Sequence, residues 1–392
     1  MPLKKIVIEK ANRLYQLPPP LFTSLQKKRD KTLIKKTDIL NFTKFSWPVK
    51  AASDFGVTGE GIKPASDSKL ALLKETLARW FEKQHGVRLD VDKEIYIGHG
   101  VRNLLLFIAL AFIDRGELAF VPRLGYPHFR RIVAASGGED VNYEVSAKSD
   151  WFPDFSAVSS PIGRIARILF LNSPHNPSGL ALNEKELKEL VVTTAKENVM
   201  IINDATYQSV SGTNPASLLS TKSGTKIGAE VYSFSYTFGL PSLPFGFVAG
   251  QFEIINALKQ LSQLSPQPIH EFYCDLAIES ISKFPNTELK NVRRKIDDSR
   301  TEGMKLLDLL KLEKSGFDTV PFLWAKIRGR RNAVTAAKVL YRSGKILAVP
   351  GTEFGESGEG YLRFSLTASP ETFISACQRI EKKKRLFKTV GD

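Results

Sequence analysis

Hydrophobic and polar residues follow a helical period along residues 69–85. The apolar positions recur every three or four residues with polar residues between them, as in a helix that buries one face. We predict an amphipathic helix here, and further helices over residues 253–280 and 290–312. The apolar positions of the first stretch are Leu70, Leu72, Leu73, Leu77, Trp80 and Phe81.

Three other stretches are apolar without a helical period. Residues 168–172, 199–204 and 231–235 are rich in aliphatic, β-branched or aromatic side chains and end in small or polar ones. Such strands suit a parallel sheet that helices cover on both faces, and ligands of these sheets lie at the carboxyl ends of the strands. The sequence therefore predicts an α/β fold with a large, mainly parallel sheet.

The last part of the chain alternates strands and helices over shorter distances. Residues 322–328 and 346–349 have strand patterns. A helical stretch through Val339 and Leu340 lies between them and ends at a turn that contains Gly344. These elements indicate a second, smaller α/β unit.

Composition restricts the class of protein. The chain has 392 residues, 42% of them hydrophobic and 25% charged, which is ordinary for a globular protein with a substantial core. No apolar run reaches the ~18 residues of a transmembrane helix. Residues 1–10 lack the apolar segment of a secretory signal, and Cys274 and Cys377 have no metal-ligand spacing. We expect a soluble cytoplasmic protein that does not associate with membranes.

The chain carries a formal net charge of +15 at pH 7. Such a charge can attract nucleic acid, acidic lipid or anionic small molecules. The lysines are spread along the chain, however, and the densest basic cluster, residues 382–385, lies near the C-terminus. A solvated lysine-rich surface therefore explains the charge more simply than a nucleic-acid partner does.

A glycine turn at residues 95–100 precedes an apolar helix predicted over residues 104–112. The free backbone N–H groups and the dipole at the start of a helix both favour an anion such as phosphate. The turn is therefore a candidate anion site. Arg102, in the first turn of the helix, either adds positive charge to this site or faces solvent.

The most informative stretch covers residues 231–247. A buried-strand pattern ends in Ser233 and Ser235, and a glycine-containing turn follows. The stretch resembles the lysine segment of class I and II aminotransferases, which have fold type I and use pyridoxal phosphate (PLP). In that family the residue after the second serine is the Schiff-base lysine, which bonds the cofactor. This chain has Tyr236 there, and Pro244 takes the place of an arginine that binds the cofactor phosphate.

Two further motifs extend the resemblance to the cofactor ring. Residues 168–179 join an apolar strand to an Asn-Pro-x-Gly turn, in which Asn176 matches the asparagine that donates to the cofactor's phenolic oxygen. Residues 199–207 contain Asp204, which matches the aspartate that pairs with the pyridinium nitrogen and keeps the ring an electron sink. Tyr207 matches the tyrosine that contacts the phenolic oxygen.

The resemblance also implies contacts for the cofactor phosphate. Gly100, Val101 and Arg102 match the turn that holds the phosphate in the family, and Ser233 and Ser235 fit further phosphate contacts. Arg102 would then replace the positive charge lost at position 244.

Two more residues follow from resembling motifs. Tyr126, in a Pro-x-x-Gly-Tyr-Pro segment, matches the tyrosine whose ring lies against the cofactor ring. Arg363, within residues 350–366, matches the arginine that binds the substrate α-carboxylate. Arginine suits that role because its planar donors match the two carboxylate oxygens.

Other positions depart from the family pattern. Phe45 and Trp47 stand where the family has small or turn residues in the loop that receives the substrate carboxylate, which would narrow or reshape a substrate site. Lys63 takes the place of a tyrosine that reaches the partner subunit's cofactor phosphate, and a lysine can still reach a phosphate.

The resemblance covers about residues 12–380. It implies that residues 1–50 form an N-terminal arm and part of a small domain, residues 51–285 the large cofactor-binding domain, and residues 286–392 the small C-terminal domain. Family members are usually homodimers. The implied ligands are PLP or pyridoxamine phosphate (PMP), held noncovalently by this chain, and an amino acid or 2-oxo acid.

The tyrosine at position 236 changes the chemistry that the family implies. The lysine holds PLP and then shuttles a proton, whereas tyrosine forms no imine and, with a reference pKa of about 10, is a poor base near neutral pH. Three functions stay open. They are a degenerate PLP or PMP site with weak or no transaminase activity, an active aminotransferase or lyase with altered chemistry, and a non-catalytic partner or regulatory subunit. The second would use Tyr236 as acid and base, or a lysine from elsewhere; Lys222 and Lys226 are the nearest upstream lysines.

Overall fold

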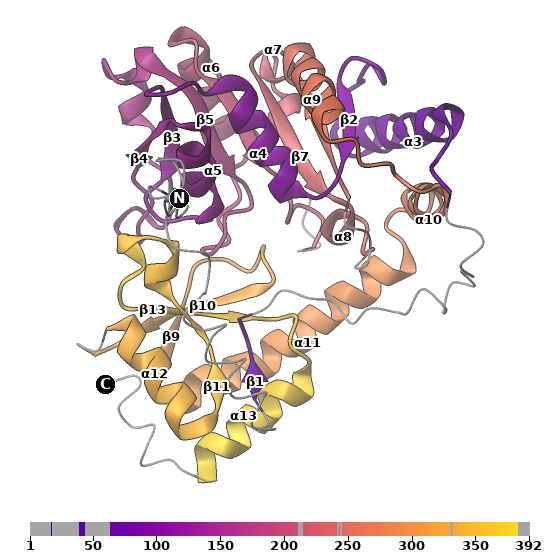
Figure 1. The fold of residues 1–392 in the computed structure, drawn as a ribbon. Helices are drawn as coiled ribbons and strands as arrows, with labels where there is room; N and C mark the ends of the chain where they lie inside the picture. Colours follow the sequence, from indigo (N-terminus) through magenta and orange to yellow (C-terminus); the bar gives the residue numbers. More distant parts are fainter. Residues whose placement is uncertain are drawn as a thin grey trace, which may run out of the picture.

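Two sheet-centred units make up the chain, an upper unit around a large sheet and a lower unit around a small one (Figure 1). Phe45, Trp47 and Pro244, which mark departures from the family pattern, lie outside the described residues. The residues that the computed structural model describes are 17, 39–43, 63–210, 215–240, 243, 245–329 and 332–382.

The large sheet has seven described strands in the order β2-β8-β7-β6-β5-β3-β4. Strands β7, β6, β5, β3 and β4 run parallel, whereas β8 is antiparallel to both of its neighbours. The mainly parallel sheet predicted from the apolar runs is confirmed. The bounds are β2 (Ile95–Gly98), β3 (Leu118–Pro122), β4 (Glu139–Tyr143), β5 (Ala166–Asn172), β6 (Met200–Asp204), β7 (Gly228–Ser233) and β8 (Gly246–Gly250).

The first predicted helix begins slightly earlier than its apolar pattern. The Ser66 hydroxyl accepts a hydrogen bond from the Lys69 backbone and caps the helix, and Gly86 ends it with a left-handed φ of 70°. The helices of the upper unit are α3 (Asp67–His85), α4 (Val101–Phe112), α5 (His128–Ser136), α6 (Glu184–Lys196), α7 (Gly224–Ile227), α8 (Phe234–Thr237), α9 (Phe252–Leu264) and α10 (Glu271–Ser282).

The helical prediction for residues 253–280 is confirmed, as two separate helices, α9 and α10. Pro266 and Pro268 lie between them, and proline lacks the N–H that a continuing helix needs.

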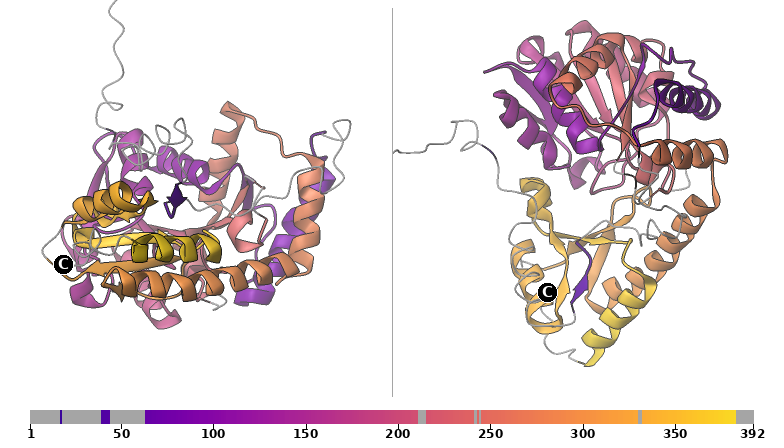
Figure 2. Two further views of the ribbon diagram at one scale, coloured as in Figure 1. Left: turned by 90° about the horizontal axis from the view of Figure 1, so that it is seen from below. Right: turned by 45° about the vertical axis from the view of Figure 1, so that its right-hand side comes forward.

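Helices cover both faces of the large sheet (Figure 2). In β5, Ile168 and Phe170 lie in one buried cluster with residues of α4, α5 and α9. Leu169 and Leu171 lie in another cluster with residues of α6. Successive side chains of a strand point to opposite faces, so a strand buried on both faces reads as a continuous apolar run.

The lower unit is built from both ends of the described chain. Its four-stranded sheet has the order β12-β13-β10-β9 and is antiparallel throughout, while β1 pairs with β11 in a separate parallel pair. The elements are β1 (Leu40–Asn41), α11 (Thr287–Leu309), β9 (Leu312–Ser315), β10 (Phe322–Ile327), α12 (Ala333–Gly344), β11 (Ile346–Leu347), β12 (Val349–Pro350), β13 (Tyr361–Ser365) and α13 (Pro370–Lys382).

Two expectations for the lower unit need correction. The strand predicted over residues 346–349 is two strands, because β11 pairs with β1 and β12 pairs with β13 on either side of Ala348. The long charged helix ends at Leu309, and Lys311 takes a left-handed φ of 57° before β9 begins.

The two units share a hydrophobic cluster. Trp324, Phe354 and Tyr361 of the lower unit pack in one buried cluster with Phe120 and Leu124 of the upper unit. A backbone hydrogen bond of 2.7 Å also joins the Phe317 amide to the Ser178 carbonyl. These contacts fix the lower unit against the edge of the large sheet.

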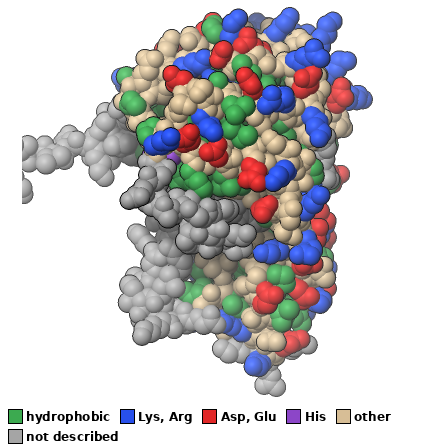
Figure 3. Space-filling view, turned by 90° about the vertical axis from the view of Figure 1, so that its right-hand side faces the viewer, with side chains coloured by type: hydrophobic (Ala, Val, Ile, Leu, Met, Phe, Trp, Pro, Cys, Tyr) green, Lys and Arg blue, Asp and Glu red, His purple; other side chains and the backbone are tan. Residues whose placement is uncertain are grey.

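Basic and acidic side chains are interspersed on the face drawn in Figure 3. Elsewhere in the structure, Lys69 of α3 pairs with Asp275 of α10 at 2.6 Å, and Lys283 pairs with Glu279 at 2.7 Å at the end of α10. This face fits the interpretation of the positive charge as a solvated surface. None of the helices in the described part of the chain is long and apolar enough to span a membrane.

Candidate functional site

The polar residues predicted for the site meet at the carboxyl ends of three neighbouring parallel strands. Asn176 follows β5, Asp204 ends β6 and Ser233 ends β7. Asn172, at the end of β5, is the register partner of Asp204. The sheet therefore brings together residues that are far apart in the sequence, at the edge where ligands of parallel sheets bind.

Asp204 is a buried carboxylate at the centre of this edge. Its side chain is 3% exposed, and its Oδ1 accepts hydrogen bonds from the Thr206 amide at 3.1 Å and from the Thr206 hydroxyl at 2.5 Å. Burial raises the pKa of Asp204 to about 6, although the bonds from Thr206 and the charge of Arg102 act in the opposite direction. The group is therefore mostly ionised at neutral pH, in surroundings that favour a cationic partner.

Asn176 connects the loop after β5 to Arg363. The Asn176 Oδ1 accepts from the Arg363 Nη1 at 3.0 Å. The backbone N–H of Asn176 donates to the Asn172 Oδ1 at 2.8 Å. The Asn172 Nδ2 in turn donates to the backbone carbonyl of Asp204 at 2.8 Å. Asn172 therefore ties the loop to the end of β6, a role that sequence reasoning missed although the residue stands at the end of a predicted strand.

Arg363 lies on β13 with its guanidinium group between two aromatic rings. The guanidinium carbon is 4.1 Å from the centre of the Phe322 ring and 4.8 Å from that of Phe354. The residue is 4% exposed, and burial lowers its pKa to about 10. The group stays cationic at neutral pH in a poorly hydrated place, so a bound carboxylate would be strongly attracted.

Tyr236 lies on the short helix α8 and faces the same cluster. Its ring centre is 5.8 Å from that of Tyr207, which in turn packs at 5.5 Å against Phe322. Burial raises the pKa of Tyr236 well above 10, against the lowering effect of Arg102 and Arg363. The phenol is therefore protonated at neutral pH.

The glycine turn and Arg102 lie beside these residues. Gly100 precedes α4 with a left-handed φ of 71°, and Val101 begins the helix. The Arg102 Nε donates to the Tyr126 hydroxyl at 2.7 Å, and Tyr126 raises the pKa of Arg102. The Arg102 side chain is exposed, yet it is held toward Tyr126 and the anion site rather than extended into solvent.

The two serines of the central stretch differ in their surroundings. Ser233 is buried at the start of α8, without a capping hydrogen bond from its side chain. The Ser235 hydroxyl donates to the Leu243 carbonyl at 2.9 Å. Since a serine has one hydroxyl hydrogen, Ser235 closes the following turn and would need to rotate to donate to a phosphate.

The lysines that sequence analysis considered lie elsewhere. Lys226 is at the opposite edge of the sheet, beside Met200 and Ile227 at the amino ends of β6 and β7, and Lys222 is exposed nearby in sequence. Lys63 forms an exposed ion pair with Glu271 at 2.7 Å. Among the described residues, the main charges that shift the pKa of Tyr236 include no lysine.

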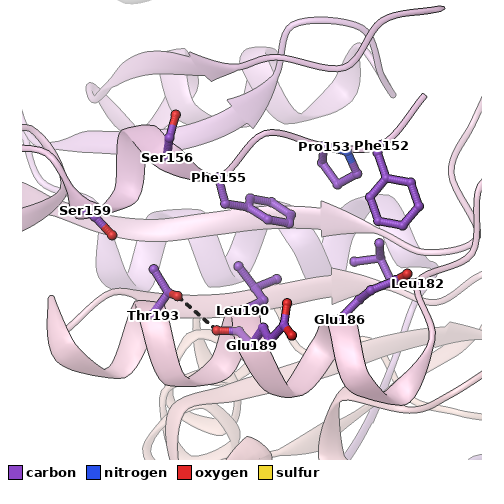
Figure 4. Close-up of a pocket in the computed structure, with 10 residues that line it drawn as sticks. All are labelled: Phe152, Pro153, Phe155, Ser156, Ser159, Leu182, Glu186, Glu189, Leu190 and Thr193. Atoms are coloured by element: carbon purple, nitrogen blue, oxygen red, sulfur yellow. Dashed lines mark hydrogen bonds between the residues drawn. The ribbon is translucent and has the colours of Figure 1, made fainter. Parts of the chain in front are cut away.

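A hollow of about 300 Å³ lies away from the cluster (Figure 4). It runs between Phe152 and Phe155 on one side and α6 on the other, with Leu190 at its floor. It contains none of the predicted site residues and no buried charge. The hollow is therefore a surface groove beside a helix, whereas the chemical groups gather at the strand ends.

Glu230 supports the site from within the sheet, and sequence reasoning missed it. It is fully buried on β7, and each of its carboxylate oxygens accepts two hydrogen bonds. Asn203, one of the donors, also accepts from the Ser173 amide at 3.0 Å and so anchors the loop that carries Asn176. The donors are Asn203 Nδ2 (2.8 Å), Leu218 N (3.0 Å), Tyr232 OH (2.7 Å) and Ser217 Oγ.

The donor set fits PLP or PMP held without a covalent bond. Asp204 is a buried carboxylate, so a protonated ring nitrogen beside it would offset its charge. Tyr207 and the Asn176 amide group suit a phenolic oxygen, and the start of α4 with Arg102 suits a phosphate. The phenol of Tyr236 offers no amine for a covalent bond.

Comparisons with known proteins agree with this geometry. The family model for aminotransferase class I and II matches residues 49–380. The LL-diaminopimelate aminotransferase of Halothermothrix orenii is 27% identical over 97% of this chain and 100% of its own length. That of Moorella thermoacetica is 27% identical over 96% of this chain and 98% of its own.

A solved structure shares the fold. The substrate-bound BacF of Bacillus subtilis matches with a TM-score of 0.86 at 21% identity, over 96% of this chain and 98% of that chain. The α/β fold with a large, mainly parallel sheet is confirmed.

Proposed function

Because the chain belongs to the family of class I and II aminotransferases, we propose that it retains the family's site for PLP or PMP, holds either one noncovalently, and has weak or no transaminase activity by itself. Members of this family use PLP or PMP and act on amino acids and 2-oxo acids. The observation that carries the proposal is the position of Tyr236, a protonated phenol inside a cluster that contains Asp204, Asn176 and Arg363.

Three residues would hold the cofactor ring. Asp204 would pair with the protonated ring nitrogen, and Tyr207 and the Asn176 amide group would donate to the phenolic oxygen. When bound, the protonated pyridine ring supplies an electron sink. Tyr126, held by Arg102, would lie against the ring.

The phosphate would lie at the start of α4. The free amides after Gly100 and the positive end of the helix dipole favour an anion there. Arg102 and the Ser233 hydroxyl would add donors. With a proline at position 244, Arg102 is the described arginine best placed to supply positive charge at this end.

The substrate carboxylate would bind Arg363. Its guanidinium is oriented by Asn176 and by two aromatic rings, so little rotamer entropy is lost on binding. An amino acid or 2-oxo acid would thus be held beside the cofactor even where the reaction is slow.

Two observations favour weak activity over altered chemistry. Tyr236 keeps its proton at neutral pH because burial raises its pKa, so it is a poor general base. Lys222 and Lys226 precede β7, at the edge of the sheet opposite the cluster. Loss of one proton-transfer group typically removes a factor of about 10² to 10⁴ in rate.

A homodimer is the proposed assembly, by analogy with the family. If no cofactor binds, the alternative function is that of a non-catalytic partner or regulatory subunit.

An absorbance titration of the purified protein with PLP and PMP tests the proposal, followed by borohydride reduction and peptide mass mapping. We expect a saturable shift of the cofactor spectrum and no reduced adduct on the chain. An adduct mapped to a lysine would instead mean an active enzyme with a substitute lysine, and the absence of binding would leave the non-catalytic reading.

A further inference from the structure

A turn of the lower unit meets the loop that carries Asn176. The turn covers residues 316–319, between β9 and β10, and the loop covers residues 173–180, after β5. We call them the lower turn and the asparagine loop. The lower turn contains no residue that we assign to the cofactor or to the substrate, yet it makes close contacts with the loop.

Hydrogen bonds to backbone carbonyls join the two segments. The Phe317 amide donates to the Ser178 carbonyl at 2.7 Å. The Thr319 hydroxyl donates to the carbonyl of Gly179, which is 140 residues away in the chain. The lower turn therefore binds the second half of the asparagine loop, just after Asn176.

Glycines on both sides allow the two backbones to approach this closely. A Cβ atom added to Gly179 would lie 2.3 Å from the Phe317 carbonyl oxygen, and one added to Gly316 would lie 2.2 Å from the Ser178 carbonyl oxygen. Both glycines also have a left-handed φ, of 79° and 73°, which other residues rarely adopt. Because no side chain separates the two backbones, a shift of the lower turn shifts the loop.

The lower turn is itself held by the lower unit. The Asp318 carboxylate pairs with Arg300 of α11 at 2.6 Å and with Lys314 of β9 at 2.6 Å. The Arg300 Nη2 also donates to the Asp318 backbone carbonyl at 3.1 Å. The lower turn thus has a defined position relative to α11, and it can impose that position on the loop.

The asparagine loop can transmit this position to Asn176. The Gly179 amide donates to the His175 carbonyl at 2.7 Å, and the His175 amide donates to the Leu180 carbonyl at 2.8 Å. The His175 Nδ1 also lies 2.7 Å from the Ser178 hydroxyl oxygen. Asn176 therefore lies inside a closed turn, in which a displacement at Gly179 reaches the asparagine.

We propose that Thr319 is a positioning residue of the cofactor site, which fixes the orientation of the Asn176 amide group from the lower unit. The inference rests on the proposed function, because it needs a cofactor whose phenolic oxygen accepts from Asn176. Thr319 acts through the Gly179 carbonyl and not on the ligand itself. The lower unit then helps to hold the cofactor ring as well as the substrate carboxylate.

Equilibrium dialysis of PMP with the full chain and with its Thr319→Val variant tests the inference. Valine keeps the shape of threonine but lacks the hydroxyl, so the Asn176 amide group would occupy its binding orientation for less of the time. We expect the dissociation constant of PMP to rise about 2- to 10-fold. PMP is the probe because it has no aldehyde that could react with amines.

The pH dependence of the absorbance of bound PMP is a second readout, which a general loosening of the fold would not shift. A donor on the phenolic oxygen favours its ionised form and so lowers its pKa. We therefore expect the phenolic pKa of bound PMP to be higher in Thr319→Val than in the parent. A loss of affinity without this shift overturns the inference.

Two variants serve as controls. Thr319→Ser keeps the hydroxyl and should match the parent in both measurements. Thr301→Val makes the same chemical change in α11, where the Thr301 hydroxyl donates to the Asp297 carbonyl at 3.1 Å, and it should leave both measurements unchanged. An equal change in Thr319→Ser and Thr319→Val would overturn the inference, because the hydroxyl would not be its cause.

The remaining outcomes separate the inference from the proposed function. If Thr319→Val binds PMP as tightly as the parent and with the same phenolic pKa, the inference is wrong and the proposed function stands. If the parent chain binds neither PMP nor PLP, both are wrong.

Discussion

The two sides of the candidate site are built very differently. On the strand side, Asn172, Asn176 and Asp204 are joined to one another and to Arg363 by hydrogen bonds. On the turn side, Tyr236 stands on a four-residue helix, and the centre of its ring lies 5.8 Å from that of Tyr207. Replacing Asn172 or Asn176 leaves a buried polar group without its partner, which costs about 1–3 kcal/mol. We expect a smaller loss for a change at position 236.

This difference offers a physical reason for the pattern of retained and changed residues. Asn176 and Arg363 are also structural groups of the sheet edge, because they bond to each other, so the chain loses stability if they change. Position 236 lies on a four-residue helix and should tolerate substitution better. The predictions below test whether each side behaves accordingly.

The largest effect is expected from Tyr236→Lys. If the strand side is intact, the new amine should bond PLP, give an adduct that borohydride fixes to residue 236, and raise the rate of transamination of L-alanine by about 10²- to 10⁴-fold. Stopped-flow absorbance and peptide mapping measure these effects. Tyr236→Phe is the control and should give neither. A Tyr236→Lys protein that binds PLP but forms no adduct would show that the strand side has diverged too.

Glu230→Ala should be the most damaging change to stability on the strand side. It removes the acceptor for four buried donors, so we expect the free energy of unfolding to fall by about 3 kcal/mol or more. Urea unfolding measures it. Tyr236→Phe, on the turn side, should change the same quantity by less than about 1 kcal/mol. Equal losses in the two variants would remove the distinction between the two sides.

Asp204→Asn should raise stability and weaken cofactor binding. The folded pKa of Asp204 is about 6 against an ordinary 3.8, so the folded chain binds more protons than the unfolded chain between these values. Its free energy of unfolding therefore falls as pH rises from about 4 to 6, by up to about 3 kcal/mol.

In the Asp204→Asn variant, the free energy of unfolding should not fall in this way between pH 4 and 6. Without cofactor it should be more stable than the parent at pH 8, and about equal to it or less stable at pH 4. Urea unfolding at both values measures this, and PLP titration should show weaker binding. A variant that is less stable than the parent at pH 8 would mean that the carboxylate is stabilised by groups beyond Thr206.

The smallest effect is expected from Thr206→Val. The substitution keeps the shape of the side chain but removes the hydroxyl that donates to Asp204, so the Asp204 pKa should rise further. We expect a loss of about 1 kcal/mol at pH 8. In the Asp204→Asn background the loss should be smaller, which a double-mutant cycle would show.

Much of the strand side was accessible from the sequence. The apolar runs located β5 and β6, and the rule for parallel sheets placed Asp204 and the loop with Asn176 at one edge. The α6 helix begins after Asn183, which forms a capping box with Glu186 that depends on those few residues alone. These features depend on short stretches of chain.

Other features depend on contacts between distant segments. The rings of Phe322 and Phe354 enclose Arg363 from different parts of the lower unit. The role of Glu230 arises only when β6 and β7 pair in register, and in the sequence it looks like a polar interruption of a strand. The split between β11 and β12 likewise depends on β1, which is far away in the chain.

Strand β1 leaves the ribosome long before β11, the strand with which it pairs. The last strand of the large sheet ends at Gly250, and β11 ends at Leu347, roughly 100 residues later, or about 5 to 20 s at ordinary synthesis rates. The upper sheet can therefore close while Phe42 still lacks the rings of Phe364 and Phe373 on which it packs. A nascent chain stalled after β8 should already protect the upper sheet from protease, whereas the bond between Arg363 and Asn176 must be among the last to form.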